Sequence, residues 1–197
     1  MLKRTAGLML VVLVAMFGVA CATQKVPAEA AIKAAEQAFD AVKGEATAYA
    51  PDQIAGVEEA LKSAKDAFAK GDYQAALTAA QAIPEKVTAL ATAATAKKNE
   101  LTKGWEGMSA GLPKVVEAIQ SRVDILSKAK KLPAGMDKAK FESAKTGLAE
   151  VKQNWTAATA AFGGGNLKDA VAKATAVKGK AAEIMGALGM PVPEGLK

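Results

Sequence analysis

Few residues of this chain have side chains suited to catalysis or metal binding. Its 197 residues include no His and a single Cys, Cys21. Without His there is no His-ligated metal site and no Ser-His-Asp or Cys-His nucleophile, and one Cys forms neither a zinc finger nor a disulfide framework. Carboxylates are scattered, and pairs such as Glu58 and Glu59 are adjacent rather than convergent. The sequence therefore predicts a protein that is not an enzyme and that holds no metal.

One serine and one lysine have the spacing of a catalytic motif. Ser127 and Lys130 fit the Ser-x-x-Lys pattern of penicillin-binding proteins, and residues 145–147 fit their Lys-Thr-Gly pattern. In those enzymes the second motif lies on a strand far downstream, whereas here it falls inside a strongly periodic helical segment. We interpret both matches as chance, so a murein- or lipid-modifying enzyme is the least supported hypothesis.

Two further features favour structural roles. The triple glycine at 163–165 precedes a helix and could hold an anion, but it lacks the Lys-Ser/Thr ending of a phosphate loop. Trp105 and Trp155 could stack on bases, but they lie at helical spacing among apolar residues. We expect a hairpin turn at the glycines, core packing of the tryptophans and no nucleic-acid partner.

The composition is typical of a helical protein. Apolar residues make up 51% of the chain and aromatic residues only 5%, while Ala alone accounts for roughly a quarter, well above its usual share. Ala is the best helix former and adds little core volume, so closely packed helices fit this chain better than a sandwich or a barrel.

Apolar residues recur at intervals of three and four, which indicates amphipathic helices. Pro84 removes a backbone donor within the third helix, so we expect a kink or a break near Ile83, and the continued apolar spacing favours the kink. Residues 111–113, Gly-Leu-Pro, predict a turn. The expected fold class is all-α, an antiparallel bundle of about six helices at 27–45, 51–70, 73–108, 116–131, 141–162 and 167–188.

Two hairpins in the sequence are alike. Shifting the chain by 94 positions aligns residues 71–73, Gly-Asp-Tyr, with residues 165–167, Gly-Asn-Leu. Gly71 can end one helix in the left-handed conformation and Asp72 can cap the next. Much of the identity is Ala, so chance similarity is the alternative, but the shared turn residues favour duplication and two related helical-hairpin units.

The N-terminus is organised as a signal peptide. Lys3 and Arg4 precede an uncharged apolar stretch, which is shorter than the ~20 residues that a spanning helix needs. An uncleaved membrane anchor is the alternative. The predicted organisation is a signal peptide at 1–20, a lipidated N-terminus and tether at 21–27, a helical bundle domain at 28–188 and an extended C-terminal tail at 189–197.

Residues 17–21, Phe-Gly-Val-Ala-Cys, resemble the lipobox of bacterial lipoproteins. The resemblance implies that Cys21 becomes the mature N-terminus and carries covalent lipid, so that no dissociable cofactor is expected. Gly18 departs from the Leu that is commonest in the family. In the sorting rule of these proteins, Asp after the Cys favours the inner membrane; Ala22 therefore implies the periplasmic side of the outer membrane.

Residues 49–51, Tyr-Ala-Pro, with the Gly-Asp-Tyr turn at 71–73 resemble a family of bacterial cell-envelope lipoproteins that contain a helical domain of unknown function. This resemblance covers about residues 28–83. The Gly-Asp-Tyr hairpin is also similar to one unit of a tetratricopeptide repeat, although a regular repeat period is absent. These resemblances imply a fold and a compartment, and they transfer no catalytic residue.

Five lysines surround one predicted turn. If the helices alternate in direction, this turn lies at the same end as the lipidated N-terminus, where lysines can contact anionic headgroups. The alternative is a solvated helix end at which Lys complements the helix dipole. The cluster consists of Lys128, Lys130, Lys131, Lys138 and Lys140.

These observations predict a lipid-anchored, periplasm-facing structural or protein-interaction module of the bacterial envelope. Its partners would be the membrane, through the anchor, and an envelope protein bound in a groove between hairpins. The alternative is a carrier that holds a small apolar ligand inside the bundle. An enclosed cavity lined by Leu61, Val151 and Trp155 would favour the carrier.

Overall fold

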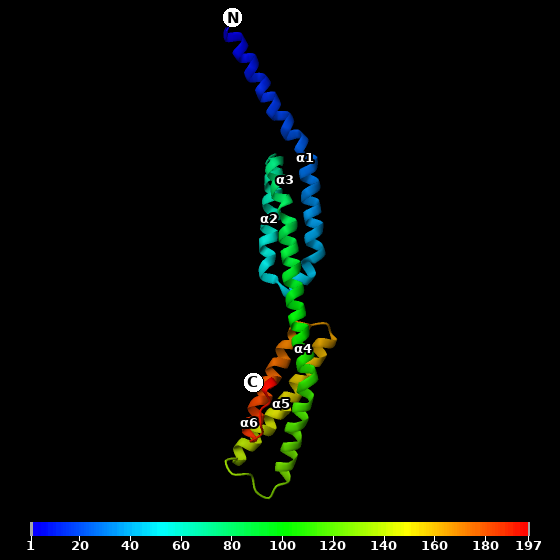
Figure 1. The fold of residues 1–197 in the computed structure, drawn as a ribbon, viewed down its shortest axis with the longest axis vertical. Coiled ribbons are helices and arrows are strands. Elements are labelled where there is room, and N and C mark those ends of the chain that lie inside the picture. The colour runs from blue at the N-terminus through cyan, green and yellow to red at the C-terminus, as the bar shows by residue number, and fades with distance from the viewer. Residues whose placement is uncertain (1, 197) are drawn as a thin grey trace. The chain divides into compact units, whose positions relative to one another are not determined.

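The computed structural model describes the backbone of residues 2–196 and the side chains of residues 24–196. Within this part the chain is helical and contains no strand, which confirms the all-α prediction (Figure 1). The predicted signal peptide and Cys21 lie outside the described side chains. The helices are α1 (Leu2–Tyr49), α2 (Pro51–Ala69), α3 (Tyr73–Gln81), α4 (Ile83–Lys128), α5 (Lys138–Gly163), α6 (Leu167–Ala187) and the 3-10 helix η1 (Glu194–Leu196).

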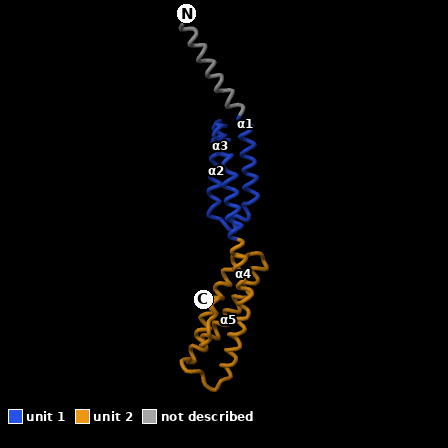
Figure 2. The backbone as a smooth tube through the Cα atoms, viewed as in Figure 1, with its two compact units in different colours: residues 1–97 blue, residues 98–197 orange. Residues whose placement is uncertain are grey.

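The predicted bundle is divided between two compact units, residues 1–97 and 98–197 (Figure 2). In the first unit α1, α2 and α3 pack against one another in pairs. Alanines occupy much of this core because their small side chains let the helix backbones approach closely. The larger buried side chains of this core include Phe39, Ile83 and Leu90.

The second unit has its own apolar core. It combines the later part of α4 with α5 and α6, and α5 and α6 pack along their length. On α4 the buried residues recur every seven positions, which places them on one face of the helix. Trp105, Leu112, Ile119 and Leu126 follow this spacing, and Val123, four residues after Ile119, is buried as well.

The two hairpin turns have the same backbone geometry. Gly71 and Gly165 adopt φ values of 81° and 80°, in the left-handed region that favours glycine. In the first turn Asp72 Oδ1 accepts a hydrogen bond from the backbone N–H of Ala75 at 3.0 Å. In the second, Asn166 Oδ1 accepts one from the N–H of Asp169 at 3.1 Å. The predicted roles of Gly71 and Asp72 are confirmed.

Removing either cap is expected to destabilise its unit. We expect Asp72→Ala and Asn166→Ala each to lower the free energy of unfolding by about 1 kcal/mol, because each leaves a helix N-terminal donor without its side-chain acceptor. Urea unfolding followed by circular dichroism measures the change. Asp72→Asn and Asn166→Asp keep an acceptor and serve as controls, so equal losses in the controls would contradict a capping role.

The predicted turn at residues 111–113 is wrong, because α4 continues through them with Pro113 inside the helix. Leu112 is 2% exposed, so it belongs to a buried stripe that a turn would break. Near Pro84 one residue, Ala82, separates α3 from α4. The sequence favoured a kink here, but the structure has the alternative, a break between two helices. Pro84 is then the second residue of α4, a position where its missing N–H has no helical partner to lose.

The predicted extended tail also differs from the structure. Residues 194–196 form η1, and Leu196 is buried at 8% exposure. η1 packs against α6, so the C-terminal segment belongs to the second unit's folded surface.

Candidate functional site

The residues of the candidate catalytic motifs do not form a site. Ser127 lies in the last turn of α4 and Lys130 in the connection that follows, and both are exposed. Residues 145–147 lie inside α5, as the periodicity predicted, and Lys145 pairs with Glu142 at 3.1 Å. The described residues therefore give these matches no catalytic arrangement.

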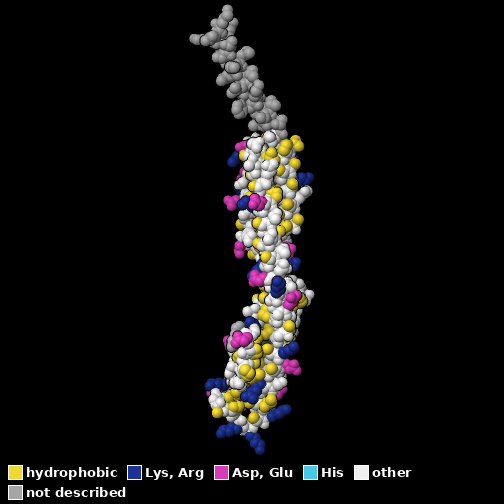
Figure 3. Space-filling view, viewed as in Figure 1, with side chains coloured by type: hydrophobic (Ala, Val, Ile, Leu, Met, Phe, Trp, Pro, Cys, Tyr) yellow, Lys and Arg dark blue, Asp and Glu magenta, His cyan; other side chains and the backbone are white. Residues whose placement is uncertain are grey.

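The five lysines of the basic cluster surround the connection between α4 and α5, and all are exposed. In Figure 3 dark-blue side chains gather at this end of the second unit. Their predicted membrane contact assumed a reversal of the chain at residues 111–113. Because α4 continues there, the alternation of helix directions that was to place Lys128, Lys130, Lys131, Lys138 and Lys140 at the end predicted to be lipidated does not hold.

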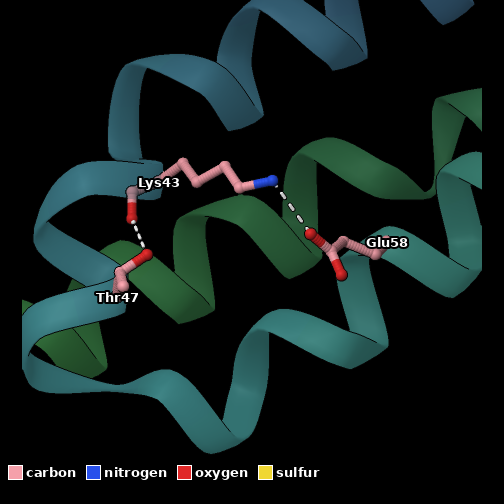
Figure 4. Close-up of polar contacts among 3 residues, drawn as sticks. All are labelled: Lys43, Thr47 and Glu58. Carbon is pink, nitrogen blue, oxygen red and sulfur yellow. Dashed lines mark hydrogen bonds and ion pairs between the residues drawn. The ribbon is translucent and has the colours of Figure 1, made fainter.

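A polar groove of about 640 Å³ lies between α1 and α2 in the first unit. Ion pairs cross or border it, including Lys43 Nζ to Glu58 Oε1 at 2.9 Å (Figure 4) and Lys62 Nζ to Asp66 Oδ2 at 2.8 Å. The hydrogen bond from Lys62 holds the pKa of the Asp66 carboxylate below its ordinary value. The paired side chains are exposed, and an exposed ion pair adds little stability. Each of these charges already has an opposite charge as its partner, so we interpret this groove as a solvated surface.

An apolar groove of about 710 Å³ lies in the second unit, between α4, α6 and the C-terminal segment. Leu101, Met108 and Val115 line it from α4, and Val171 lines it from α6. Thr175 Oγ1 lies 3.8 Å from Met108 Sδ, so the two helices meet along its wall. The volume falls within the roughly 300–1,000 Å³ range of ligand pockets.

Three glycines of α4 form part of this groove: Gly104, Gly107 and Gly111. A Cβ built on any of them would meet nothing within 4 Å, and none has a positive φ. Sequence reasoning missed these residues because it treated Gly111 as part of a turn. The available signal was their clustering on one helical segment, where each glycine costs about 1 kcal/mol relative to Ala.

The tryptophans belong to an aromatic stack in the second unit. Trp105 of α4 is 6% exposed, and its ring lies 5.7 Å from Trp155 and 4.6 Å from Phe162, with both pairs nearly parallel. The buried indole indicates core packing rather than a platform for bases. Leu61 belongs to the first unit, whereas Val151 and Trp155 belong to the second; the three therefore do not line a cavity within one unit.

The apolar groove is the strongest candidate site in the described part of the chain. No group of His, Cys, Asp and Glu among the described residues is arranged to hold a metal ion. Over the same residues, no helix combines the length and hydropathy of a membrane span. Comparison with protein-family models, curated proteins and solved structures gives no match to this chain.

Proposed function

We propose that the protein is a lipid-anchored, non-catalytic interaction module of the bacterial envelope, held by Cys21 on the periplasmic side of the outer membrane. The apolar groove of the second unit carries this proposal. Apolar grooves rimmed by polar residues are surfaces that soluble proteins use to bind partners or ligands. The lipobox-like residues 17–21 supply the anchor.

The two units derive, in this proposal, from duplication of one helical hairpin. The support is the matching turn geometry 94 residues apart, where the N–H of Asp72 donates to Ala67 O at 3.0 Å and that of Asn166 donates to Ala161 O at 2.9 Å. The groove lies in the second unit. Duplication would thus have left one hairpin free to acquire a binding surface.

The anchor is tested by expressing the full chain in a bacterial host with an alkyne analogue of palmitate. We expect the wild-type protein to be labelled and recovered with the membranes, and Cys21→Ala to be unlabelled. Thr23→Ala changes a nearby residue and should be labelled normally. Label on Cys21→Ala, or its absence from the wild type, would refute the anchor.

The interaction role is tested with the photocrosslinker p-benzoylphenylalanine at position 108, inside the groove, and at exposed position 117 as the control. A distinct envelope protein crosslinked only from position 108 is the expected result. If no protein crosslinks there, the groove does not serve a protein partner.

A carrier of a small apolar ligand is the second candidate, and the same groove favours it. Its lining is largely apolar, and the flexible thioether of Met108 can adapt to irregular ligands. The crosslinking result separates the two functions, since a carrier predicts ligand binding without protein capture at position 108.

A further inference from the structure

The connection between α4 and α5 carries positive charge with little negative charge to balance it. The five lysines of the basic cluster fall within residues 128–140, and Asp137 is the one acidic residue of that stretch. Asp137 is already engaged, because its Oδ1 accepts a hydrogen bond from the backbone N–H of Lys140 at 2.7 Å. Among the described residues, none of the five lysines forms an ion pair. This end of the second unit therefore presents a positive surface.

Compensation of the helix dipole explains only part of the basic cluster. Lys128 lies in the last turn of α4, where a positive charge is favourable. Lys138 and Lys140 lie in the first turn of α5, which contains no acidic residue, and there the helix dipole disfavours a positive charge. Two lysines are thus placed where they weaken the helix that carries them. A local rule broken without a compensating gain in the fold is typical of functional sites.

Apolar side chains accompany these lysines. Ile125, in the last turn of α4, is 61% exposed, and it is the most exposed large apolar side chain described in the second unit. It lies three residues before Lys128, so the two share one face of the helix. Leu132 and Met136, in the connection, are half-buried. Exposed apolar residues beside lysines are typical of segments that bind at a membrane interface.

An anionic phospholipid bilayer is the partner that fits both features. Its headgroups attract lysines, which raises affinity by up to about fivefold for each lysine near the surface. Its interfacial region also takes up an apolar side chain such as Ile125. A polar anionic polymer would pair with the lysines but would leave Ile125 in water, so the combination favours the bilayer.

We propose that this end of the second unit binds the surface of an anionic phospholipid bilayer, with the five lysines on the headgroups and Ile125 inserted below them. This contact follows from the residues of the connection and does not depend on the direction in which the helices alternate. It involves neither Cys21 nor the residues that line the apolar groove. It adds a second, reversible membrane contact to the proposed anchored module.

The non-lipidated chain of residues 22–197 separates this contact from the anchor. Every described core residue lies at or after Ala28, so this chain retains the whole described core, and circular dichroism verifies its folding. Cosedimentation with vesicles of phosphatidylglycerol and phosphatidylcholine in equal parts measures binding. We expect saturable binding that weakens as salt is added, and none to vesicles of phosphatidylcholine alone. Absence of binding to the anionic vesicles would overturn the proposal.

Replacing all five lysines of the basic cluster with Gln should weaken binding to the anionic vesicles by about tenfold or more. A matched control replaces five exposed lysines elsewhere with Gln, which changes the net charge equally, and it should lose clearly less affinity. Equal losses in the two variants would indicate attraction by net charge alone and would overturn the assignment to this end of the unit. The control replacements are at Lys86, Lys103, Lys114, Lys152 and Lys168.

Insertion is measured at position 125 itself. Cys21 is the single Cys of the chain, so Ile125→Cys in residues 22–197 takes one nitrobenzoxadiazole label. We expect its emission to brighten and shift to the blue on anionic vesicles. A label at Glu117→Cys is the control, exposed on the same helix and about 12 Å farther from its end, and it should change little.

Equal shifts at the two positions, or no shift at position 125 in the bound protein, would overturn the insertion of Ile125. Each of these experiments uses the chain without lipid and without a protein partner. Their failure is therefore distinct from a failure of the Cys21 labelling or of the crosslinking at position 108.

Discussion

Trp105→Ala is expected to lower the free energy of unfolding of the second unit by about 3–5 kcal/mol, the usual cost of truncating a buried aromatic residue. Trp155 and Phe162 are seven residues apart on α5, which is about 10.5 Å along a helix. Their ring distances to Trp105 are 5.7 Å and 4.6 Å, so the indole of Trp105 lies between them. Its removal eliminates both stacked pairs and leaves a cavity.

Urea unfolding followed by circular dichroism measures this loss. Phe162→Ala is the matched control, because it removes one stacked pair from a ring that is 45% exposed, and it should cost clearly less. Both tryptophans lie in the second unit, so the fluorescence of Trp155 follows that unit in the variant. A loss below about 1 kcal/mol for Trp105→Ala would contradict the placement of its indole between Trp155 and Phe162.

The hairpins could be predicted because their signals are local and agree. Gly71 supplies the left-handed residue, Asp72 supplies the cap, and both act within a few residues of the turn that they form. The apolar spacing of α5 likewise predicted Phe141 and Leu148 in the core. Where propensity, capping and apolar periodicity favour the same structure, sequence reasoning is reliable.

The course of α4 could not be predicted because two signals conflict there. Glycine and proline at 111–113 are local turn signals, while burial of Leu112 and Ile119 favours one continuous helix. The apolar residues Trp105, Leu112, Ile119 and Leu126 keep one helical phase across this stretch, and tertiary packing of that face decides for the helix. The same conflict explains why the sequence did not indicate the apolar groove. Glycines that are typical of turns lie within α4 and line the groove.

The proposed anchor and the candidate groove differ in the signals that indicate them. The proposal for Cys21 depends on a short contiguous motif that resembles a lipobox. The groove combines residues from α4, α6 and the C-terminal segment, which come together only on folding. Sequence reasoning expected a groove between hairpins but could not name the residues that line it.

Pro113→Ala is expected to stabilise the protein by about 2–2.6 kcal/mol. A proline inside a helix costs about 3 kcal/mol through its missing N–H and its clash with the preceding turn, and α4 bears this cost in mid-helix. Part of the gain is offset because alanine gives the unfolded chain more freedom, worth about 0.4–1 kcal/mol. Thermal and urea unfolding measure the difference.

Pro84→Ala is the matched control from the same helix. Pro84 is the second residue of α4, where proline is well tolerated, so its replacement removes only the restriction on the unfolded chain and should lower stability by up to about 1 kcal/mol. The two substitutions thus have opposite expected signs. A neutral or destabilising effect of Pro113→Ala would indicate that the chain turns at residues 111–113, as its local signals suggest. The apolar groove would then lose the continuous helix α4 that lines it.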